Sequence, residues 1–411
     1  MNEANPPRPL ESHGVTWARV RLAHRLGRAA VASAAAVLVA NALNRAVFEA
    51  GALPGAVVSL VTMALLVASF IVWFQRAAWP GAVTFDAAGL DVRRGGTTRR
   101  IERSRIASAY AVTRYARRTF VPTVEMELEG GDLVSFEVSS DETARAIVDD
   151  LGFGRGKKRI RIALGSPARR LYHVLVGLVA YYVASIAAAP VMLLAGGAEW
   201  LVMLGGLVNA LALVGAYAFL RGLVRAPEVT IGDDGVLYRA GRKRRFLPGA
   251  AITAVEQPSV ALPLLVHASG AVPLAIHGSA LDVERRSAVA RLAYERFVGP
   301  SAPADQDGAQ FARGGRTVAA WREHLRARGR DVGYREAASP TDVAAAVLCN
   351  PRSTSEERVG AALALRVAGE PEARIRVAAG AVADDRLRVA LETIAEVDDD
   401  VAIERALRKL R

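Results

Sequence analysis

One stretch of the chain has the glycine and lysine content of a phosphate-binding loop: residues 152–158, with the sequence GFGRGKK. In a P-loop, a glycine-rich turn holds the phosphates through its backbone amides, and a Ser or Thr after the lysine holds magnesium. Here Leu151 occupies the place of the first glycine, and Lys158 occupies the place of the Ser or Thr. The segment therefore does not predict nucleotide binding, and its positive charges need another explanation.

Other motifs for catalysis or metal binding are not found in the sequence. The six histidines lack metal-ligand spacing, and neither G-x-S-x-G nor H-E-x-x-H occurs. The single cysteine, Cys349, excludes a disulfide framework and a cysteine-based zinc or iron–sulfur site. Because Cys349 follows a run of Ala, Val and Leu, we expect it to be a small core residue. The sequence thus predicts a protein that is not an enzyme, with no catalytic residue, cofactor or metal.

Basic residues are concentrated in two short segments, and these are the candidate ligand-binding residues. Each Lys or Arg next to anionic lipid contributes about 1 kcal/mol to binding. We therefore expect the two segments to bind anionic headgroups, with membrane topology and solubility as the alternative explanation of their charge. Nucleic acid is not an expected partner, because membrane orientation already accounts for the net charge of +12. The candidate residues are Arg155, Lys157, Lys158, Arg159, Arg161, Arg242, Lys243, Arg244 and Arg245.

Four apolar segments are long enough to cross a bilayer, which takes about 20 residues. The composition agrees, because 52% hydrophobic and 23% charged residues are too apolar for a soluble enzyme of 411 residues. The first segment, which contains Asn41 and Asn44, has a signal peptide as its alternative. The sequence thus predicts a membrane protein of α+β class with two transmembrane helical hairpins. The four segments are approximately 29–48, 55–74, 171–194 and 199–220.

The distribution of arginine predicts how these spans are oriented. The turns within the two hairpins contain no Lys or Arg, whereas the outer flanks of the spans are basic. Since Lys and Arg stay on the cytoplasmic side, both termini and both large polar parts are expected to be cytoplasmic, in a bacterial inner membrane. No Asp, Glu or Lys lies in the centre of a span, so transport is less favoured.

The chain contains an internal duplication, in which residues 83–106 correspond to 229–252. The two segments share seven identical positions out of 24 without a gap. In each copy an apolar hairpin is followed by short alternating segments, which are typical of β-strands. In the first copy we expect strands at about 81–86, 89–94, 97–102 and 106–113, then a β-hairpin that turns at 130–132. Ser139 and Glu142 have the spacing of a capping box, which predicts a helix after the strands.

These repeated units resemble the bacterial pleckstrin-homology-like domains of polytopic membrane proteins. The resemblance implies a strongly bent sheet of about seven strands capped by one helix, and an interaction module without catalytic residues. Pro263 and Pro273 depart from the pattern in the second copy and leave its strand count open. The residues that carry the resemblance are Val83, Thr84, Gly89, Leu90, Arg93, Gly95 and Ile106, with their counterparts in the second copy.

The C-terminal part has a different, helical pattern. The spacing of Arg358, Ala361 and Leu365 recurs further along the chain, beginning at Arg388. This pattern resembles HEAT-like repeats, with ordinary helical packing as the alternative. Residues 301–411 carry 18 basic and 18 acidic side chains, so this part is neutral. A Pro- and Gly-containing linker precedes it, and contacts across such linkers are usually few, so we expect the part to be separable.

Together these patterns predict a non-enzymatic integral membrane protein that acts as a cytoplasmic-face scaffold or adaptor. Its expected partners are anionic lipid headgroups and an unidentified protein. A transporter or permease accessory subunit is the alternative, followed by a membrane enzyme. The expected organisation is a basic cytoplasmic leader at 1–28, transmembrane hairpins at 29–74 and 171–220, PH-like domains at 75–155 and 221–298, a basic juxtamembrane linker at 156–170, a linker at 299–309 and a helical, HEAT-like domain at 310–411.

Overall fold

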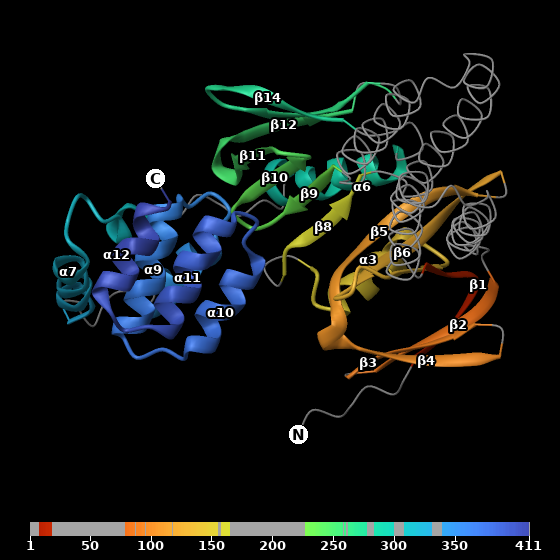
Figure 1. Cartoon of the computed structure of the whole chain (residues 1–411), viewed down its shortest axis with the longest axis horizontal. Helices are drawn as coiled ribbons and strands as arrows, with labels where there is room; N and C mark the ends of the chain where they lie inside the picture. Colours follow the sequence, from red (N-terminus) through yellow and green to blue (C-terminus); the bar gives the residue numbers. More distant parts are fainter. Residues whose placement is uncertain are drawn as a thin grey trace, which may run out of the picture. The chain divides into compact units, whose positions relative to one another are not determined.

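The computed structural model describes residues 8–18, 79–164, 227–299, 308–330 and 339–410, apart from residues 87, 95, 117, 155–157, 258, 260–261 and 278–282. Its elements are labelled in Figure 1. By their internal contacts the residues divide into two compact units. The first contains residues 1–107, 126–136 and 165–226, and the second contains residues 108–125, 137–164 and 227–411.

The described residues of the first copy form seven strands followed by one helix. The strands form one sheet in the order β4-β3-β2-β1-β7-β6-β5. Alternate side chains such as Val83, Leu90 and Val92 are buried, as the periodicity of two residues predicts. The expected strands at 81–86, 89–94, 97–102 and 106–113 are therefore confirmed. The elements are β1 (Arg8–Ala18), β2 (Trp79–Asp86), β3 (Gly89–Arg94), β4 (Thr97–Glu102), the 3-10 turn η1 (Arg103–Arg105), β5 (Ile106–Ala116), β6 (Thr119–Leu128), β7 (Leu133–Glu137) and α3 (Asp141–Asp150).

Strand β1 differs from the sequence expectation, because residues 8–18 do not belong to a separate leader. The strand pairs antiparallel with β2, from Arg8 opposite Phe85 to Ser12 opposite Gly81. On its other edge it pairs with β7, where Val15 lies opposite Phe136. Val15 is completely buried. The leader expected at 1–28 is therefore corrected: part of it is a central strand of the sheet.

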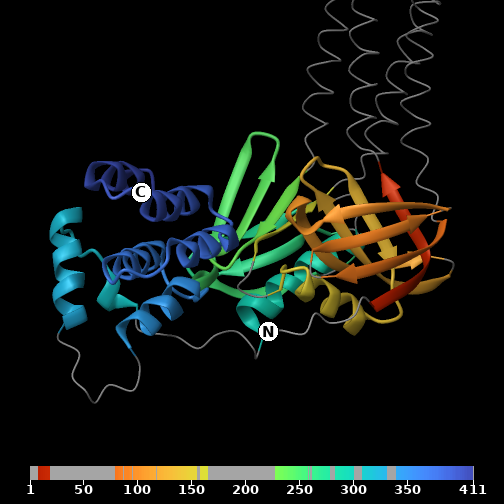
Figure 2. The same cartoon turned by 90° about the horizontal axis from the view of Figure 1, so that it is seen from below.

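The second copy also has seven strands among its described residues, arranged as two sheets. The first sheet has the order β11-β10-β9-β8, and the second has the order β12-β13-β14. The long β10–β11 hairpin can be followed in Figure 2 by its light green colour. The elements are β8 (Ile160–Ala163), β9 (Glu228–Ile231), β10 (Gly235–Ala240), β11 (Lys243–Pro248), the 3-10 turn η2 (Gly249–Ala251), β12 (Ile252–Glu256), β13 (Leu264–Ala268), β14 (Ala271–Ile276), α6 (Val283–Ala293) and the π-helical turn η4 (Tyr294–Val298).

The duplication seen in the sequence is also present in the secondary structure. Strands β3 and β10, strands β4 and β11, and turns η1 and η2 each begin at equivalent positions of the two copies. Strand β8 has the place of β1, because Ile160 pairs with Ile231 as Arg8 pairs with Phe85. The repeated unit thus begins with a strand that precedes each predicted hairpin. Residues 160–163 are part of this unit and not of the linker expected at 156–170.

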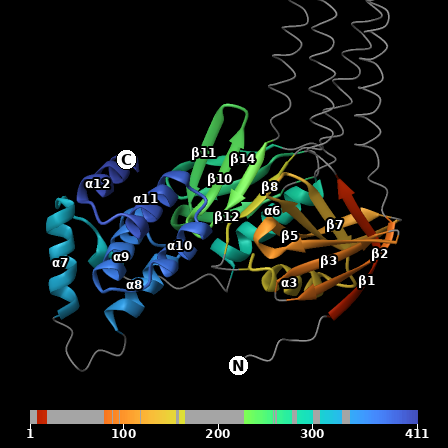
Figure 3. The same cartoon turned by 60° about the horizontal axis from the view of Figure 1, so that its bottom comes forward.

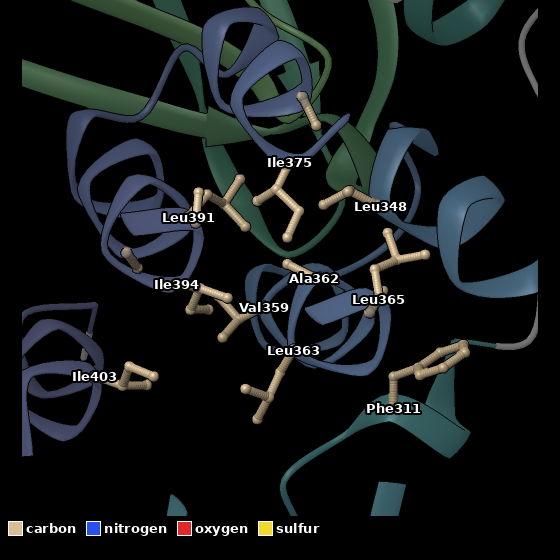
Figure 4. Close-up of a cluster of buried hydrophobic side chains, with 14 of the residues drawn as sticks. Phe311, Leu348, Val359, Ala362, Leu363, Leu365, Ile375, Leu391, Ile394 and Ile403 are labelled. Atoms are coloured by element: carbon tan, nitrogen blue, oxygen red, sulfur yellow. The ribbon is translucent and has the colours of Figure 1, made fainter. Parts of the chain in front are cut away.

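The C-terminal residues form helices around one apolar core. Helix α9 contacts α7, α8 and α11, and α10 contacts α11; Figure 3 labels these helices. Figure 4 shows the side chains of α9 in the middle of the core, between Leu391 of α11 and Leu348 of α8. The starts of α9 and α11 have the same separation as Arg358 and Arg388, as the sequence spacing predicts. The elements are the 3-10 turn η5 (Ala309–Phe311), α7 (Val318–Arg330), α8 (Pro340–Cys349), α9 (Ser355–Val367), α10 (Glu372–Ala381), α11 (Asp385–Glu396) and α12 (Asp400–Arg408).

The expected membrane fold class is not what the described residues show. None of the helices in the described ranges is both long enough and apolar enough to cross a membrane. The four expected spans, at 29–48, 55–74, 171–194 and 199–220, lie outside the described residues. The lack of a membrane-crossing helix in the described ranges contradicts the multi-pass fold and the inner-membrane location expected from the sequence. The fold class is corrected to α+β, with antiparallel sheets followed by a helical C-terminal part.

Candidate functional site

The first basic segment is largely engaged in contacts within the protein. Arg155 and Lys157 lie outside the described residues. The ammonium of Lys158 lies 5.0 Å from the centre of the Phe153 ring, a cation–π distance. Arg159 lies 3.8 Å from the Asp385 carboxylate, and Arg161 lies 3.0 Å from the Glu228 carboxylate. The described residues of this segment therefore hold β8 in place and do not form a free cationic surface.

The second basic segment lies at the turn between β10 and β11, and the structure separates its four members. Arg244 lies 2.6 Å from Asp384 at the start of α11. The guanidinium of Arg245 donates to the backbone oxygens of Pro273 and Val272 in β14. Arg242 and Lys243 are exposed. Of the nine basic residues expected to bind lipid, these two are the ones with exposed side chains and no internal ion pair among the described residues.

The β9–β10 turn is the place where the second copy and the helices meet. Its sequence is Gly232-Asp233-Asp234-Gly235, and the Asp234 carboxylate accepts hydrogen bonds from the amides of Ala383 at 2.6 Å and Asp384 at 2.8 Å. These amides lie at the start of α11, where backbone N–H groups lack partners within the helix. A Cβ on Gly232 would lie 2.3 Å from the Ala383 nitrogen, so the approach of the two backbones requires glycine.

Two buried arginines complete this junction. Arg358 of α9 is 1% exposed. Its guanidinium donates to the backbone oxygen of Asp233 at 2.8 Å and to the backbone oxygen of Asn350 at 2.6 Å. Burial lowers the pKa of Arg358, while burial raises the pKa of Asp234. Arg296 of η4 lies 3.5 Å from the Asp233 carboxylate. The expectation of few contacts is therefore wrong, and we expect the C-terminal part to depend on this junction.

A second buried ionic cluster surrounds Glu125 of β6. Tyr110 and Arg114 of β5 donate to its carboxylate, and Arg285 of α6 donates to it at 3.1 Å. Burial alone would raise the pKa of Glu125, but Arg285 and Arg114 outweigh it and lower the pKa from 4.5 to about 2. Glu125 therefore remains ionised near neutral pH. With both oxygens engaged, it joins strands to α6 and does not act as an acid or base.

A pocket of about 340 Å³ lies between α3, the loop after it and α6. Its charged lining combines Arg145, Arg291 and Arg296 with Asp149 and Glu295. Arg291 donates to the Ala111 oxygen at 2.7 Å, and Arg145 lies 3.9 Å from Glu295. Burial and the neighbouring charge of Arg145 lower the pKa of Arg291. Because the described lining contains no Ser, Thr, Cys, Lys or His, the pocket does not offer a nucleophile with an adjacent base.

Metal coordination is not supported in the described part of the chain. No group of three or more His, Cys, Asp or Glu residues there is arranged to hold a metal ion. His267 lies 3.3 Å from Glu256 on the neighbouring strand, which is a pair and not a ligand set. Cys349 ends α8 and is exposed, so the expectation of a core cysteine is wrong.

The sequence reasoning missed an exposed aromatic pair at the β5–β6 turn. Tyr115 is 62% exposed and Phe120 is 76% exposed. The signal was present, since both aromatics lie within the run RYARRTF between two alternating segments. In a strand, however, an aromatic residue is ordinarily assigned to the core.

No protein-family model matches the chain, and no curated protein is similar to it in sequence.

Proposed function

We propose that the protein is a non-enzymatic scaffold or adaptor whose helical C-terminal part binds a protein partner. One observation carries the proposal: an apolar side chain is left exposed on each of the three last helices. Val377 of α10 is 58% exposed, Val389 of α11 is 41% exposed and Val401 of α12 is 63% exposed. Apolar side chains that gather on one exposed face mark an interaction surface, and we take these three valines as the anchors of such a face.

The buried junction supports this reading, because it fixes the helices that carry these valines. The amides that Asp234 binds precede α11, and Arg358 anchors α9 to the β9–β10 turn. A surface that is already ordered loses less conformational entropy on binding than a flexible one. The second copy and the helices therefore form a preorganised support for a partner.

The chemistry of the described clusters supports binding over catalysis. The carboxylate of Glu125 is buried with both oxygens engaged, and the carboxylate of Asp234 accepts from the two amides that precede α11. Neither group is positioned for proton transfer to a bound substrate, which requires an accessible acid or base.

The proposal is tested with surface variants of the full-length protein, because removing the helices would leave the buried Asp233 and Asp234 turn unpartnered. The double variant Val377→Asp and Val401→Asp places a charge at two exposed valines. Ala319→Asp introduces one such charge at an exposed alanine in the first turn of α7 and serves as the control for added negative charge. Partners of each protein are identified in its own cells by chemical cross-linking and mass spectrometry.

We expect the double variant to lose a specific partner that the wild-type protein and Ala319→Asp both retain. If a valine is buried against the partner, an aspartate in its place must lose its hydration when the complex forms. This free-energy cost abolishes a binding affinity of moderate strength. If the double variant keeps the full set of partners while remaining folded, the helices are not the binding surface and the proposed function is wrong.

A further inference from the structure

The tip of the β5–β6 hairpin exposes two aromatic rings to solvent. Strand β5 ends at Ala116 and β6 begins at Thr119, so the turn contains only residues 117 and 118. The rings of Tyr115 and Phe120 lie 5.4 Å apart in an edge-to-face arrangement. Aromatic side chains bury a large area when they are covered, so leaving two of them uncovered together points to a binding role.

The base of the hairpin is held rigidly. The amide of Tyr115 donates to the Glu284 carboxylate of α6 at 2.7 Å. Arg114 pairs with the buried Glu125, which also accepts from Arg285 of the same helix. The two rings are therefore presented on a hairpin that is anchored to α6 through the backbone of Tyr115 and, by way of Glu125, through the side chain of Arg114.

The turn places an arginine in a backbone conformation that is unfavourable for it. Arg118 has a φ of 66°, and it is the one non-glycine residue with positive φ in the described part of the chain. A side chain in this conformation costs about 1–2 kcal/mol, and two-residue hairpin turns usually place Gly or Asn there. An arginine at this position thus opposes folding locally, which favours a functional reason for its charge.

The chain segment that carries the two rings has only basic charged side chains beyond Arg114. In sequence, residues 115–124 contain Arg117 and Arg118 and no Asp or Glu. Arg114 is neutralised by Glu125, and the Glu284 carboxylate is engaged by the amide of Tyr115. Tyrosine and similar aromatic rings lie at the headgroup level of bilayers, and arginine is attracted to the anionic lipids there. Such a surface accepts a projecting tip without a complementary pocket, whereas a protein partner would need one.

We propose that this hairpin tip, consisting of Tyr115, Arg118 and Phe120, inserts into the surface of an anionic lipid bilayer. The rings enter the headgroup region and Arg118 contacts lipid phosphates. The site is distinct from the basic segments at 155–161 and 242–245, and it goes beyond the protein-binding role of the helices.

The test places an environment-sensitive fluorophore at the tip of the full-length protein. Thr119→Cys is labelled in a Cys349→Ser background, which removes the single native cysteine. Vesicles of phosphatidylcholine alone are compared with vesicles of equal parts phosphatidylcholine and phosphatidylglycerol. The matched control carries the label at Thr98→Cys in β4, whose hairpin with β3 contains arginines but no aromatic residue.

We expect the emission at position 119 to shift to the blue with the anionic vesicles only, and the label at position 98 to shift less. Arg118→Gly should weaken the response about 5-fold, because one arginine near anionic lipid contributes about 1 kcal/mol. This variant also relieves the backbone, so it should not unfold the hairpin. Replacing both Tyr115 and Phe120 by Ser should abolish the shift.

Three results would overturn the proposal. If the label stays in a water-like environment with both kinds of vesicle, the tip does not insert into lipid, and a protein partner is then the alternative ligand. Equal emission shifts with neutral and anionic vesicles would refute the proposed preference for anionic lipid and the contribution of Arg118 to it. Equal shifts at positions 119 and 98 would show that general basic charge, and not this tip, brings the protein to the surface.

Discussion

Replacing Glu125 by Gln removes one buried charge while keeping the shape of the side chain. Glu125 is 3% exposed, and its carboxylate neutralises Arg114 and Arg285. Lowering its pKa from 4.5 to about 2 corresponds to roughly 3 kcal/mol of stability, at about 1.4 kcal/mol for each pH unit. Removing one partner of a buried ion pair costs about 3–5 kcal/mol in other proteins. We therefore expect Glu125→Gln to destabilise the protein by about 3 kcal/mol.

The pH dependence gives a second readout with a defined sign. Because the pKa of Glu125 is lower in the folded protein, its contribution is complete above pH 4.5 and is lost as the pH falls toward about 2. Gln does not titrate, so the difference between wild type and Glu125→Gln should shrink across this range. The measurement is urea denaturation followed by circular dichroism, with the exposed Glu129→Gln as control. Equal stabilities of the two variants, or a difference that persists in acid, would refute the role assigned to Glu125.

Three further predictions concern the junction at the β9–β10 turn. Asp234→Ala should cost about 1–2 kcal/mol in urea denaturation, because it leaves the two amides before α11 without an acceptor. Asp234→Asn should cost less, and equal costs would contradict the role of Asp234 as their acceptor. Gly232→Ala should make the junction susceptible to limited proteolysis, since the new Cβ would lie 2.3 Å from the Ala383 nitrogen. The control Gly380→Ala should remain resistant, because its Cβ has no neighbouring atom within 4 Å. A protein that ends before residue 310 should aggregate or be degraded, as judged by size-exclusion chromatography, and a stable truncated monomer would show that the contacts of Arg358 are dispensable.

Local periodicity is the part of this fold that the sequence could predict. Alternating apolar residues located β2 to β5, and the correspondence between the two copies reappears at β4 and β11. The spacing of Arg358 and Arg388 likewise placed α9 and α11. In each case the residues that determine the element are neighbours in sequence, and burial of one face then fixes it.

Long-range pairing is the part that the sequence could not predict. Residues 8–18 become a strand because β2 and β7, which lie far away in the sequence, supply its partners. The start of α3 was misplaced by one position, since Ser140 caps the amide of Thr143 at 3.1 Å and Ser139 does not. Both features depend on backbone geometry that residue types alone do not determine.

The basic segments show the same limit for the candidate site. Arg159, Arg161 and Arg244 were expected to be available to lipid, yet each has an acidic partner within the fold. Charge in a sequence does not reveal which carboxylate will lie beside it. The reverse applies to Tyr115 and Phe120, which are aromatic residues of a type that is often buried, yet are exposed because they flank a turn.

Site-specific photo-cross-linking from the valines of the helical part tests the central claim most directly. A photoreactive phenylalanine analogue at Val401 or Val377, in the full-length protein in its own cells, reports what lies within a few ångströms of each exposed side chain. The scaffold function predicts the same discrete protein adduct from both positions, and no such adduct from Ala319 on α7. Adducts that are missing at both valines, or that are identical at Ala319, would contradict it.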